Sequence, residues 1–437
     1  MSKPHTDSQL AGSATDPMPA DPAAEPTFDP QTFDPATPAY TRHPQAWFGL
    51  IHARSPVFYS GVYQAWMVYD HAVGRSVLSD LRFSRDRSHW ARAGAAEEEK
   101  EEEMARWPLT DHLRRESPFI NQVKHRSNRA LYSDAFKPRA IARIERIIGQ
   151  VVAQHCAALT TAREVDLVSL IEPIPNTVIA RVVGVSPEAR AEAAFKEAAS
   201  KFLLGVNPFC TEANKDIAES GTAYLFEAIG DLVDQRLRQP ADDLVSGLLA
   251  GIDPHTDPAE VKRDIILSVA SLLSAGTDTT RHAAAFALRT LLQRPALWAQ
   301  LRADRSLLDG AVLELLRYEF PAKFLVRFAT EDIDLGGHRF ARGDMVLTTV
   351  HGLGWDPRVF TEPERIDFRR DQRKSPVFGH GEFYCIGAHL AKSELRQLLG
   401  YFLDHLPDSA VYDESRVEWQ APDLILRGLD HLPLVLR

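Results

Sequence analysis

The chain has 437 residues, of which 44% are hydrophobic and 25% are charged, an ordinary composition for a globular protein in water. Its formal net charge of -10 disfavours nonspecific binding to nucleic acid, whose backbone is also negative. Cys156, Cys210 and Cys385 are widely spaced and offer no disulfide framework, which fits a reducing cytoplasm. The sequence has no bilayer-spanning apolar run and no signal peptide, so we expect a soluble cytoplasmic protein without a membrane anchor.

Residues 1–39 are rich in Pro, Ala, Asp and Thr and have few large apolar side chains, which predicts a disordered tail. From residue 40 onward the pattern is that of a folded domain. Residues 56–59 and 64–69 predict two short strands joined by a Ser60-Gly61 turn. Short strand patterns recur at three later positions, which are residues 333–335, 338–340 and 345–350. Because the rest has helical periodicity, we predict one mainly helical domain over residues 40–437 with a small β-sheet region.

The segment Glu97–Glu103 contains six glutamates around a single lysine. A block of like charge repels itself, so we expect a mobile, solvated segment. Two interpretations remain open for it. It is either an inert surface insertion or a charged lid that becomes ordered when a substrate binds.

A long helix is predicted from Asp257-Pro258, where Asp is typical of an N-cap and Pro of the first helical position. Its pattern continues to about Gln293, and at ~1.5 Å per residue such a helix is roughly 50 Å long. The segment Ala275–Thr280 lies in its middle and reads AGTDTT. A mid-helix Gly costs about 1 kcal/mol relative to Ala, and threonines can bond back to earlier carbonyls. We therefore predict a break at the centre that serves a function.

Two pairs of charged residues have helical spacing. Glu314 and Arg317 lie three positions apart in the helical pattern of residues 308–318, so their side chains share a face and can pair. The arginine fork could also bond backbone carbonyls. His125 and Arg129 are four positions apart and again share a face. Each of these residues, taken singly, is more typical of a solvated surface.

The loop from Phe378 to Gly387 reads FGHGEFYCIG and surrounds Cys385 with glycines. Glycine allows a tight turn and the close approach of another group. An apolar helical pattern begins directly after the loop, and the N–H groups and dipole of such a helix would favour a thiolate. A thiolate held in this way can bind a metal, and on haem iron it favours O–O cleavage. The alternative is a structural cysteine in a strand–helix turn.

This loop resembles the haem-binding loop of the cytochrome P-450 family, F-G-x-G-x-[H/R]-x-C-x-G. The matching positions are Phe378, Gly379, Gly381, Cys385 and Gly387. The resemblance implies a P-450 fold with a single haem domain, haem b as cofactor and Cys385 as its iron ligand. Phe383 departs from the pattern, because the family usually has there a histidine or arginine that binds a haem propionate.

The segment Ala275–Thr280 resembles the A-G-x-[D/E]-T-T motif of the same family. The resemblance implies that Ala275 and Gly276 make room for dioxygen above the iron. It also implies that the hydroxyl of Thr279 hydrogen-bonds the oxygen being activated and that Asp278 relays protons to it.

The remaining charged residues match further family motifs. Glu314 and Arg317 resemble the structural E-x-x-R pair, which the family completes with a later arginine; Arg370 is expected here and Arg369 is its rival. Buried propionates need cationic partners. The resemblance assigns that role to three residues, which are His125, Arg129 and Arg327. Because Phe383 is uncharged, these three would have to supply the cations.

The implied function is a monooxygenase that inserts one atom of O2 into a small organic substrate, by hydroxylation or oxidative dealkylation. Electrons would come from NAD(P)H through a ferredoxin reductase and a ferredoxin. The expected docking surface is basic and comprises Arg114, Arg115, Lys124, Arg126, Arg373 and Lys374. One alternative is a peroxide-driven enzyme, although such members usually lack the acid–alcohol pair. The other is a non-catalytic haem sensor, which has no need of Asp278 and Thr279.

The family alignment also indicates where the substrate would lie. The expected cavity is apolar, with candidate residues Phe119, Phe202, Leu203, Leu272, Ala275, Phe324 and Leu325. Lys323 would either hold an anionic group of the substrate or face solvent. The acidic segment Glu97–Glu103 falls between the family's B and C helices, in a segment that usually covers this cavity.

Overall fold

The computed structural model describes residues 26–91, 97–117, 125, 129, 136–185, 189–206, 211–251 and 257–436. Its α-helices are α1 (Pro38–Arg42), α2 (Gln45–Arg54), α3 (His71–Ser79), α4 (Glu97–Arg106), α5 (Pro108–Glu116), α7 (Pro138–His155), α8 (Leu167–Ile171), α9 (Pro173–Val183), α10 (Ala189–Val206), α11 (Glu212–Arg238), α12 (Leu244–Ala250), α13 (Pro258–Leu292), α14 (Pro295–Ala303), α15 (Leu308–Tyr318), α16 (Val350–Leu353) and α17 (Ala388–His405). Short 3-10 helices are η1 (Arg87–His89), η4 (Ala157–Thr160), η5 (Arg305–Leu307), η6 (Gly381–Phe383) and η7 (Glu414–Arg416).

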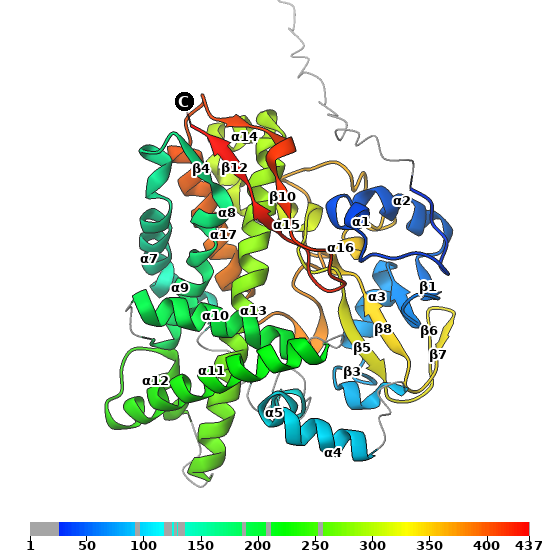
Figure 1. Cartoon of the computed structure of the whole chain (residues 1–437). Helices are drawn as coiled ribbons and strands as arrows, with labels where there is room; N and C mark the ends of the chain where they lie inside the picture. Colours follow the sequence, from blue (N-terminus) through cyan, green and yellow to red (C-terminus); the bar gives the residue numbers. More distant parts are fainter. Residues whose placement is uncertain are drawn as a thin grey trace, which may run out of the picture.

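The strands are β1 (Val57–Ser60), β2 (Ala65–Val68), β3 (Phe83–Ser84), β4 (Glu164–Asp166), β5 (Leu325–Ala329), β6 (Ile333–Leu335), β7 (His338–Phe340), β8 (Met345–Thr348), β9 (Val411–Tyr412), β10 (Glu418–Trp419), β11 (Leu429–His431) and β12 (Pro433–Val435). The helices α7, α9, α10, α11 and α13 fill one side of the molecule, whereas β1, β3, β5, β6, β7 and β8 lie on the other (Figure 1). The prediction of a mainly helical protein with a small sheet is confirmed.

The largest sheet has the strand order β1-β2-β8-β5-β3. Strands β2 and β8 are parallel, and the other neighbours are antiparallel. The predicted strands at 56–59 and 64–69 are β1 and β2. The pairing of β3 with β5 places Ser84 opposite Phe328, and the pairing of β5 with β8 places Arg327 opposite Val346. This register brings the residues after β3 beside the middle of β5.

The folded part of the chain begins closer to the N-terminus than expected. Phe28 and Phe33 are buried, and their rings meet edge to face with centroids 5.5 Å apart. Phe28 also contacts the ring of Phe58 on β1. The proposed boundary at residue 40 is therefore too late, because two aromatic side chains anchor a stretch whose average composition is polar. Residues 1–25 of the predicted tail lie outside the described residues.

The acidic segment Glu97–Glu103 is helical, so the expectation of a mobile segment is wrong. It forms α4, which packs against α5. Basic residues offset its charge: Lys215 on α11 lies 2.5 Å from Glu103. In turn, Arg106 at the end of α4 lies 3.0 Å from Glu212. These ion pairs tie α4 to α11, which lies beside the central helix.

The central helix α13 begins where the sequence predicts. The side chain of Asp257 accepts the N–H of Ala259, and Pro258 opens the first turn. The expected break at its centre is absent, because α13 is continuous to Leu292. The Thr277 and Thr279 hydroxyls donate to the carbonyls of residues 273 and 275 without interrupting the helix. Within the described parts of the chain, no helix is long and apolar enough to cross a membrane.

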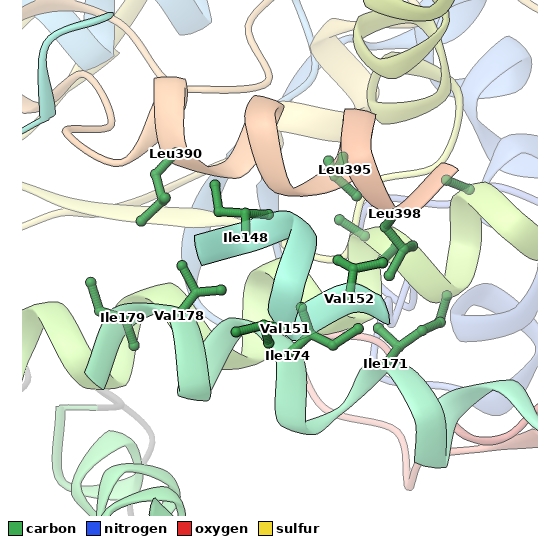
Figure 2. Close-up of a cluster of buried hydrophobic side chains, with 14 of the residues drawn as sticks. Ile148, Val151, Val152, Ile171, Ile174, Val178, Ile179, Leu390, Leu395 and Leu398 are labelled. Atoms are coloured by element: carbon green, nitrogen blue, oxygen red, sulfur yellow. The ribbon is translucent and has the colours of Figure 1, made fainter. Parts of the chain in front are cut away.

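A buried cluster of branched aliphatic side chains fixes α17. In Figure 2, α17 lies against α7, which in turn packs against α9. Full burial of such a side chain contributes about 1.5–3 kcal/mol relative to exposure. The labelled residues of the cluster are Ile148, Val151, Val152, Ile171, Ile174, Val178, Ile179, Leu390, Leu395 and Leu398. The packing holds the N-terminus of α17 in place directly after Cys385.

Candidate active site

The cysteine loop is a tight structure that only glycine permits at two positions. Gly379 and Gly381 have positive φ angles of 74° and 73°, a region that L side chains rarely adopt. A Cβ at position 381 would lie 2.8 Å from the Cα of Ser79, so the loop also runs in close contact with the end of α3. The N–H of Cys385 donates to the carbonyl of Phe378 over 2.8 Å and closes the loop. The loop therefore presents the sulfur in a fixed position.

The thiol of Cys385 is accessible, although protein surrounds it on most sides. Burial raises the pKa of this thiol, and this effect outweighs the N–H of Gly387 and the charge of Arg129, both of which lower it. The N–H of Gly387 favours the thiolate, as the sequence predicts, but burial of the sulfur acts more strongly in the opposite direction. A coordinated metal ion would displace the proton, because metal coordination deprotonates a thiol.

The middle turn of α13 also faces open space. Ala275 is exposed although the turns on either side of it are buried. Apart from its chain neighbours and the adjacent backbone of α13, a Cβ added to Gly276 would meet no atom within 4 Å. The hydroxyl of Thr279 donates to the carbonyl of Ala275 over 2.9 Å. The small residues of the AGTDTT segment thus leave room beside the helix.

Asp278 is already paired in this structure. Its carboxylate lies 2.9 Å from the Nε of Arg281, one turn later on α13. Arg281 also bonds Glu172 over 3.0 Å. The proposed proton carrier therefore shares a cation with a second carboxylate, an arrangement that the sequence motif did not reveal.

Phe383 is the centre of a group of cationic side chains. The ring of His125 lies 4.3 Å from it, and the guanidinium carbons of Arg85 and Arg327 lie 4.9 and 5.3 Å away. His125 also bonds the carbonyl of Glu382 over 3.1 Å. Two of the three predicted propionate ligands, His125 and Arg327, are thus brought together at Phe383. The third, Arg129, is near enough to Cys385 to lower the pKa of its thiol.

Arg85 is the residue that the sequence interpretation missed. It follows β3, and only the pairing of β3 with β5 brings it beside Arg327. Burial lowers the pKa of Arg85 to about 10. Burial and the charge of Arg85 lower the pKa of Arg327 to about 9. Among the described residues, neither arginine forms an ion pair with a carboxylate.

The charged network before the loop is fully paired. Arg317 donates to both carboxylate oxygens of Glu314 over 2.8 Å. Arg370 lies 3.0 Å from the same carboxylate, whereas its rival Arg369 lies near Asp304 instead. The side chains of Glu314 and Arg317 are fully buried. This network ties α15 to the segment that leads into the cysteine loop.

The predicted substrate residues divide into two groups. Phe202 and Leu272 are buried in the core around α13. Phe324 instead contacts Tyr69 and belongs to a different buried cluster, the aromatic one that contains Phe28. Leu325 is half-buried on β5. Phe119 lies outside the described residues, as does the side chain of Leu203.

Lys323 neither faces solvent nor is free to hold an anionic ligand. It is buried, and its ammonium group donates to the carbonyl of Pro35 over 3.0 Å and to the hydroxyl of Thr41 over 2.7 Å. The carbonyl of Asp423 accepts a third hydrogen bond over 2.6 Å. Both expectations for this lysine are therefore wrong, because it joins the N-terminal segment to a C-terminal loop.

The family model for cytochrome P450 matches residues 95–407, which include the central helix and the cysteine loop. The chain belongs to the cytochrome P450 family. Of its curated relatives, the cytochrome P450 monooxygenase PikC of Streptomyces venezuelae is 33% identical over 377 residues, with 85% of each chain covered. The 6-deoxyerythronolide B hydroxylase of Saccharopolyspora erythraea is 30% identical over 393 residues, covering 87% of this chain and 92% of the relative.

Solved structures share the fold. Epothilone D-bound cytochrome P450epoK superposes with a TM-score of 0.83, covers 94% of this chain and all of its own, and is 24% identical. This cytochrome P450 is thus a haem-dependent oxidoreductase of the monooxygenase class, as its curated relatives are named.

The residues present fit a haem group. An accessible thiol at the start of α17 can supply an axial ligand. Space lies beside Gly276 for a small molecule, and the buried guanidinium of Arg327 has no carboxylate partner among the residues described. Buried cations of this kind need an anion to complete them. The propionates of a haem are such anions.

Proposed function

We propose that this cytochrome P450 transfers one atom of O2 to a small, largely apolar organic substrate and releases the other atom as water. The balance is RH + O2 + 2e⁻ + 2H⁺ → ROH + H2O. The observation that carries the proposal is the accessible Cys385 thiol, held by a glycine loop at the start of α17. When bound there, haem supplies the chemistry of oxygen activation. Oxidative dealkylation would begin with the same insertion.

Different residues of the protein would bind the haem and position the oxygen. Cys385 would hold the iron, and His125, Arg129 and Arg327 would bind the propionates. Ala275 and Gly276 leave the space in which oxygen is held. The hydroxyl of Thr279 lies beside that space, and its hydrogen bond to Ala275 leaves its oxygen lone pairs free to accept another bond.

Asp278 is the proposed source of protons, and its partner sets a condition on that role. The carboxylate lies 2.9 Å from the Nε of Arg281, so the role requires this ion pair to open. We expect Arg281 to transfer its interaction to Glu172, which it already contacts at 3.0 Å, when Asp278 takes up a proton. Asp278→Asn would then slow turnover without changing substrate binding.

A second protein would supply the electrons, as NAD(P)H-reduced ferredoxin does for many oxygenases. A depression of about 310 Å³ lies against Phe378, Gly379 and Tyr384 of the cysteine loop. Arg75, Arg373 and Lys392 also line it. A basic surface this close to the iron ligand suits an acidic ferredoxin and its reductase. The side chains of Arg114, Arg115, Lys124 and Arg126 lie outside the described residues, and Lys374 follows Arg373 in the sequence.

The decisive experiment is the absorption spectrum of the reduced protein with carbon monoxide. A Soret band shifted strongly to the red, and lost in Cys385→Ser, is expected for an axial thiolate. A spectrum typical of histidine ligation would contradict the proposal.

The ratio of product formed to NAD(P)H oxidised distinguishes the alternative functions. In Thr279→Ala we expect NAD(P)H oxidation to continue while hydrogen peroxide replaces product. The matched control is Thr277→Ala, since the Thr277 hydroxyl makes the same kind of bond to Leu273 but is buried. Full turnover of the wild type with peroxide alone would favour the peroxide-driven enzyme. Unchanged coupling in Thr279→Ala would argue against the hydroxyl's role.

A further inference from the structure

Arg85 and Arg327 contact the same aromatic ring. Their guanidinium carbons lie 4.9 and 5.3 Å from the centroid of Phe383. A cation within about 6 Å of a ring centroid is attracted by the electron-rich face. Phe383 therefore holds two guanidinium groups in place, although it brings no charge of its own.

The strand register places Arg85 there independently of the cysteine loop. Strands β3 and β5 are antiparallel, with Ser84 opposite Phe328. Arg85 comes directly after the end of β3, beside Arg327, the next residue of β5 along the same register. The position of Arg85 is thus fixed by the sheet, whereas that of Phe383 is fixed by the glycine loop.

The two arginines lack a compensating charge within the described residues. Arg327 donates to the carbonyl of Val326 over 2.9 Å, and no carboxylate forms an ion pair with either guanidinium. Burial lowers the pKa of both groups, and the charge of Arg85 lowers that of Arg327 further. Arg327 is buried and Arg85 is half-buried, and two neighbouring like charges shielded from water are costly unless an anion joins them. A ligand with two negative groups would satisfy both.

We propose that Arg85 binds a haem propionate and supplies the cation that the family usually places at position 383. The proposal rests on the proposed haem binding through Cys385. Arg85 and Arg327 would take the propionates by charge-assisted hydrogen bonds, and the ring of Phe383 would keep the two forks in position. Phe383 would therefore not bind a propionate itself. It would instead position Arg85, which comes from a distant part of the chain and would bind one.

The test measures how firmly haem is held, by transfer from the holoprotein to excess apomyoglobin. For Arg85→Gln we expect the rate of haem loss to rise roughly ten- to hundredfold, the usual value of a charge-assisted hydrogen bond. Arg85→Lys, which keeps the charge but not the fork, should fall between. The control is Arg82→Gln, three residues earlier, whose guanidinium is half-exposed and pairs with Asp80 at 2.6 Å.

A modified cofactor tests whether the carboxylates are what Arg85 binds. We expect wild-type protein reconstituted with haem dimethyl ester, in which both propionates are neutral, to lose the porphyrin faster than with haem. Arg85→Gln should show a smaller difference between the two porphyrins. In Arg85→Gln/Phe383→His, a cation returns to position 383, and haem retention should recover in part.

The outcomes separate this inference from the proposed function. If the wild type holds haem with the thiolate spectrum and Arg85→Gln loses it no faster than Arg82→Gln, Arg85 is not a propionate ligand. The same conclusion follows if Arg85→Gln changes only the binding of carboxylate-bearing substrates. If the wild type takes up no haem at all, the proposed function fails instead.

Discussion

Two clusters of arginines in this protein differ in how their charges are balanced. Around Glu314, the guanidinium groups of Arg317 and Arg370 meet a carboxylate and backbone carbonyls. Around Phe383, the guanidinium groups of Arg85 and Arg327 meet an aromatic ring and, for Arg327, one carbonyl. In the first cluster a carboxylate of the protein balances the positive charges. In the second, no carboxylate among the described residues does so. This difference supports our proposal that the second cluster binds a ligand, whereas the first stabilises the fold.

Glu314→Gln should break the first cluster with the largest effect. The substitution keeps the shape of the side chain but leaves two arginines beside a neutral amide. Removing one partner of a buried ion pair typically costs about 3–5 kcal/mol. We expect a clear fall in the urea midpoint of the holoprotein and a lower yield of folded protein.

Glu362→Gln is the matched control on the same connecting segment. Glu362 pairs with Arg365 at 3.3 Å, but both side chains are more than half exposed. Exposed pairs contribute little, about 0–1 kcal/mol. Equal effects of the two substitutions would show that burial of the Glu314 network does not matter.

Arg327→Gln should separate the second cluster from the first. No carboxylate among the described residues depends on Arg327, so the substitution leaves no known buried anion behind. We expect haem to dissociate roughly ten- to hundredfold faster, since a charge-assisted bond is lost. The urea midpoint should fall far less than in Glu314→Gln.

Arg339→Gln is a suitable control for Arg327, since Arg339 is an exposed strand residue paired with Asp332 at 2.9 Å. If Arg327→Gln lowers the urea midpoint as much as Glu314→Gln and leaves haem retention unchanged, the assignment of the second cluster to a ligand is wrong.

The sequence predicted the features that depend on local patterns. The Asp257-Pro258 start of α13 and the strands β1 and β2 follow from capping, periodicity and turn residues. The glycine spacing around Cys385 was enough to place the thiol at a helix start. Local patterns did not predict that α4 would be a helix, and its pairing of Glu103 with Lys215 involves a residue on a distant helix.

Features that depend on distant contacts were not predictable. Nothing in the segment around Arg85 distinguishes it from a surface arginine until β3 pairs with β5. Likewise, the choice between Arg369 and Arg370 depends on which side chain turns toward Glu314. A lysine such as Lys323 is expected at the surface, but it is buried here because three oxygen acceptors surround its ammonium group.

Lys323 provides an intermediate case, a buried cation that is satisfied by neutral oxygens. Lys323→Met removes its bonds to Pro35, Thr41 and Asp423. Buried acceptors left unsatisfied cost about 1–3 kcal/mol, part of which is offset because a buried charge is also removed. We expect a moderate fall in the urea midpoint and faster proteolysis of the N-terminal segment. Lys262→Met, at a partly exposed lysine paired with Asp234, is the control.

The contribution of Lys323 to the stability of the fold should become more favourable as the pH rises. Burial and the charge of Arg427 lower the pKa of Lys323 to about 7, from an ordinary value of 10.5. Between these values the unfolded chain holds the proton and the folded one does not, so wild-type stability rises with pH. This rise should be missing in Lys323→Met. An identical pH profile for both proteins would contradict the buried charge.

The smallest effect is expected at the exposed pair of His431 and Asp166, whose side chains lie 2.8 Å apart. The hydrogen bond to Asp166 raises the pKa of His431 from 6.5. Burial raises the pKa of Asp166, but hydrogen bonds from Leu432 and His431 outweigh it and lower the pKa below 3.8. The histidine contribution is complete below pH 6.5 and is lost as the pH rises through the folded value. The aspartate contribution is complete above pH 3.8 and is lost as the pH falls through its folded value.

Both conditions hold together only between about pH 4 and 6.5. His431→Gln should therefore lower the melting temperature most within that window, and the difference from wild type should shrink above it. His405→Gln, at a histidine that bonds only the carbonyl of Tyr401 and forms no ion pair within the described chain, should show no such window. A loss in His431→Gln as large as that in Glu314→Gln would mean that exposure does not weaken an ion pair here, which would undo the contrast between balanced clusters and surface pairs.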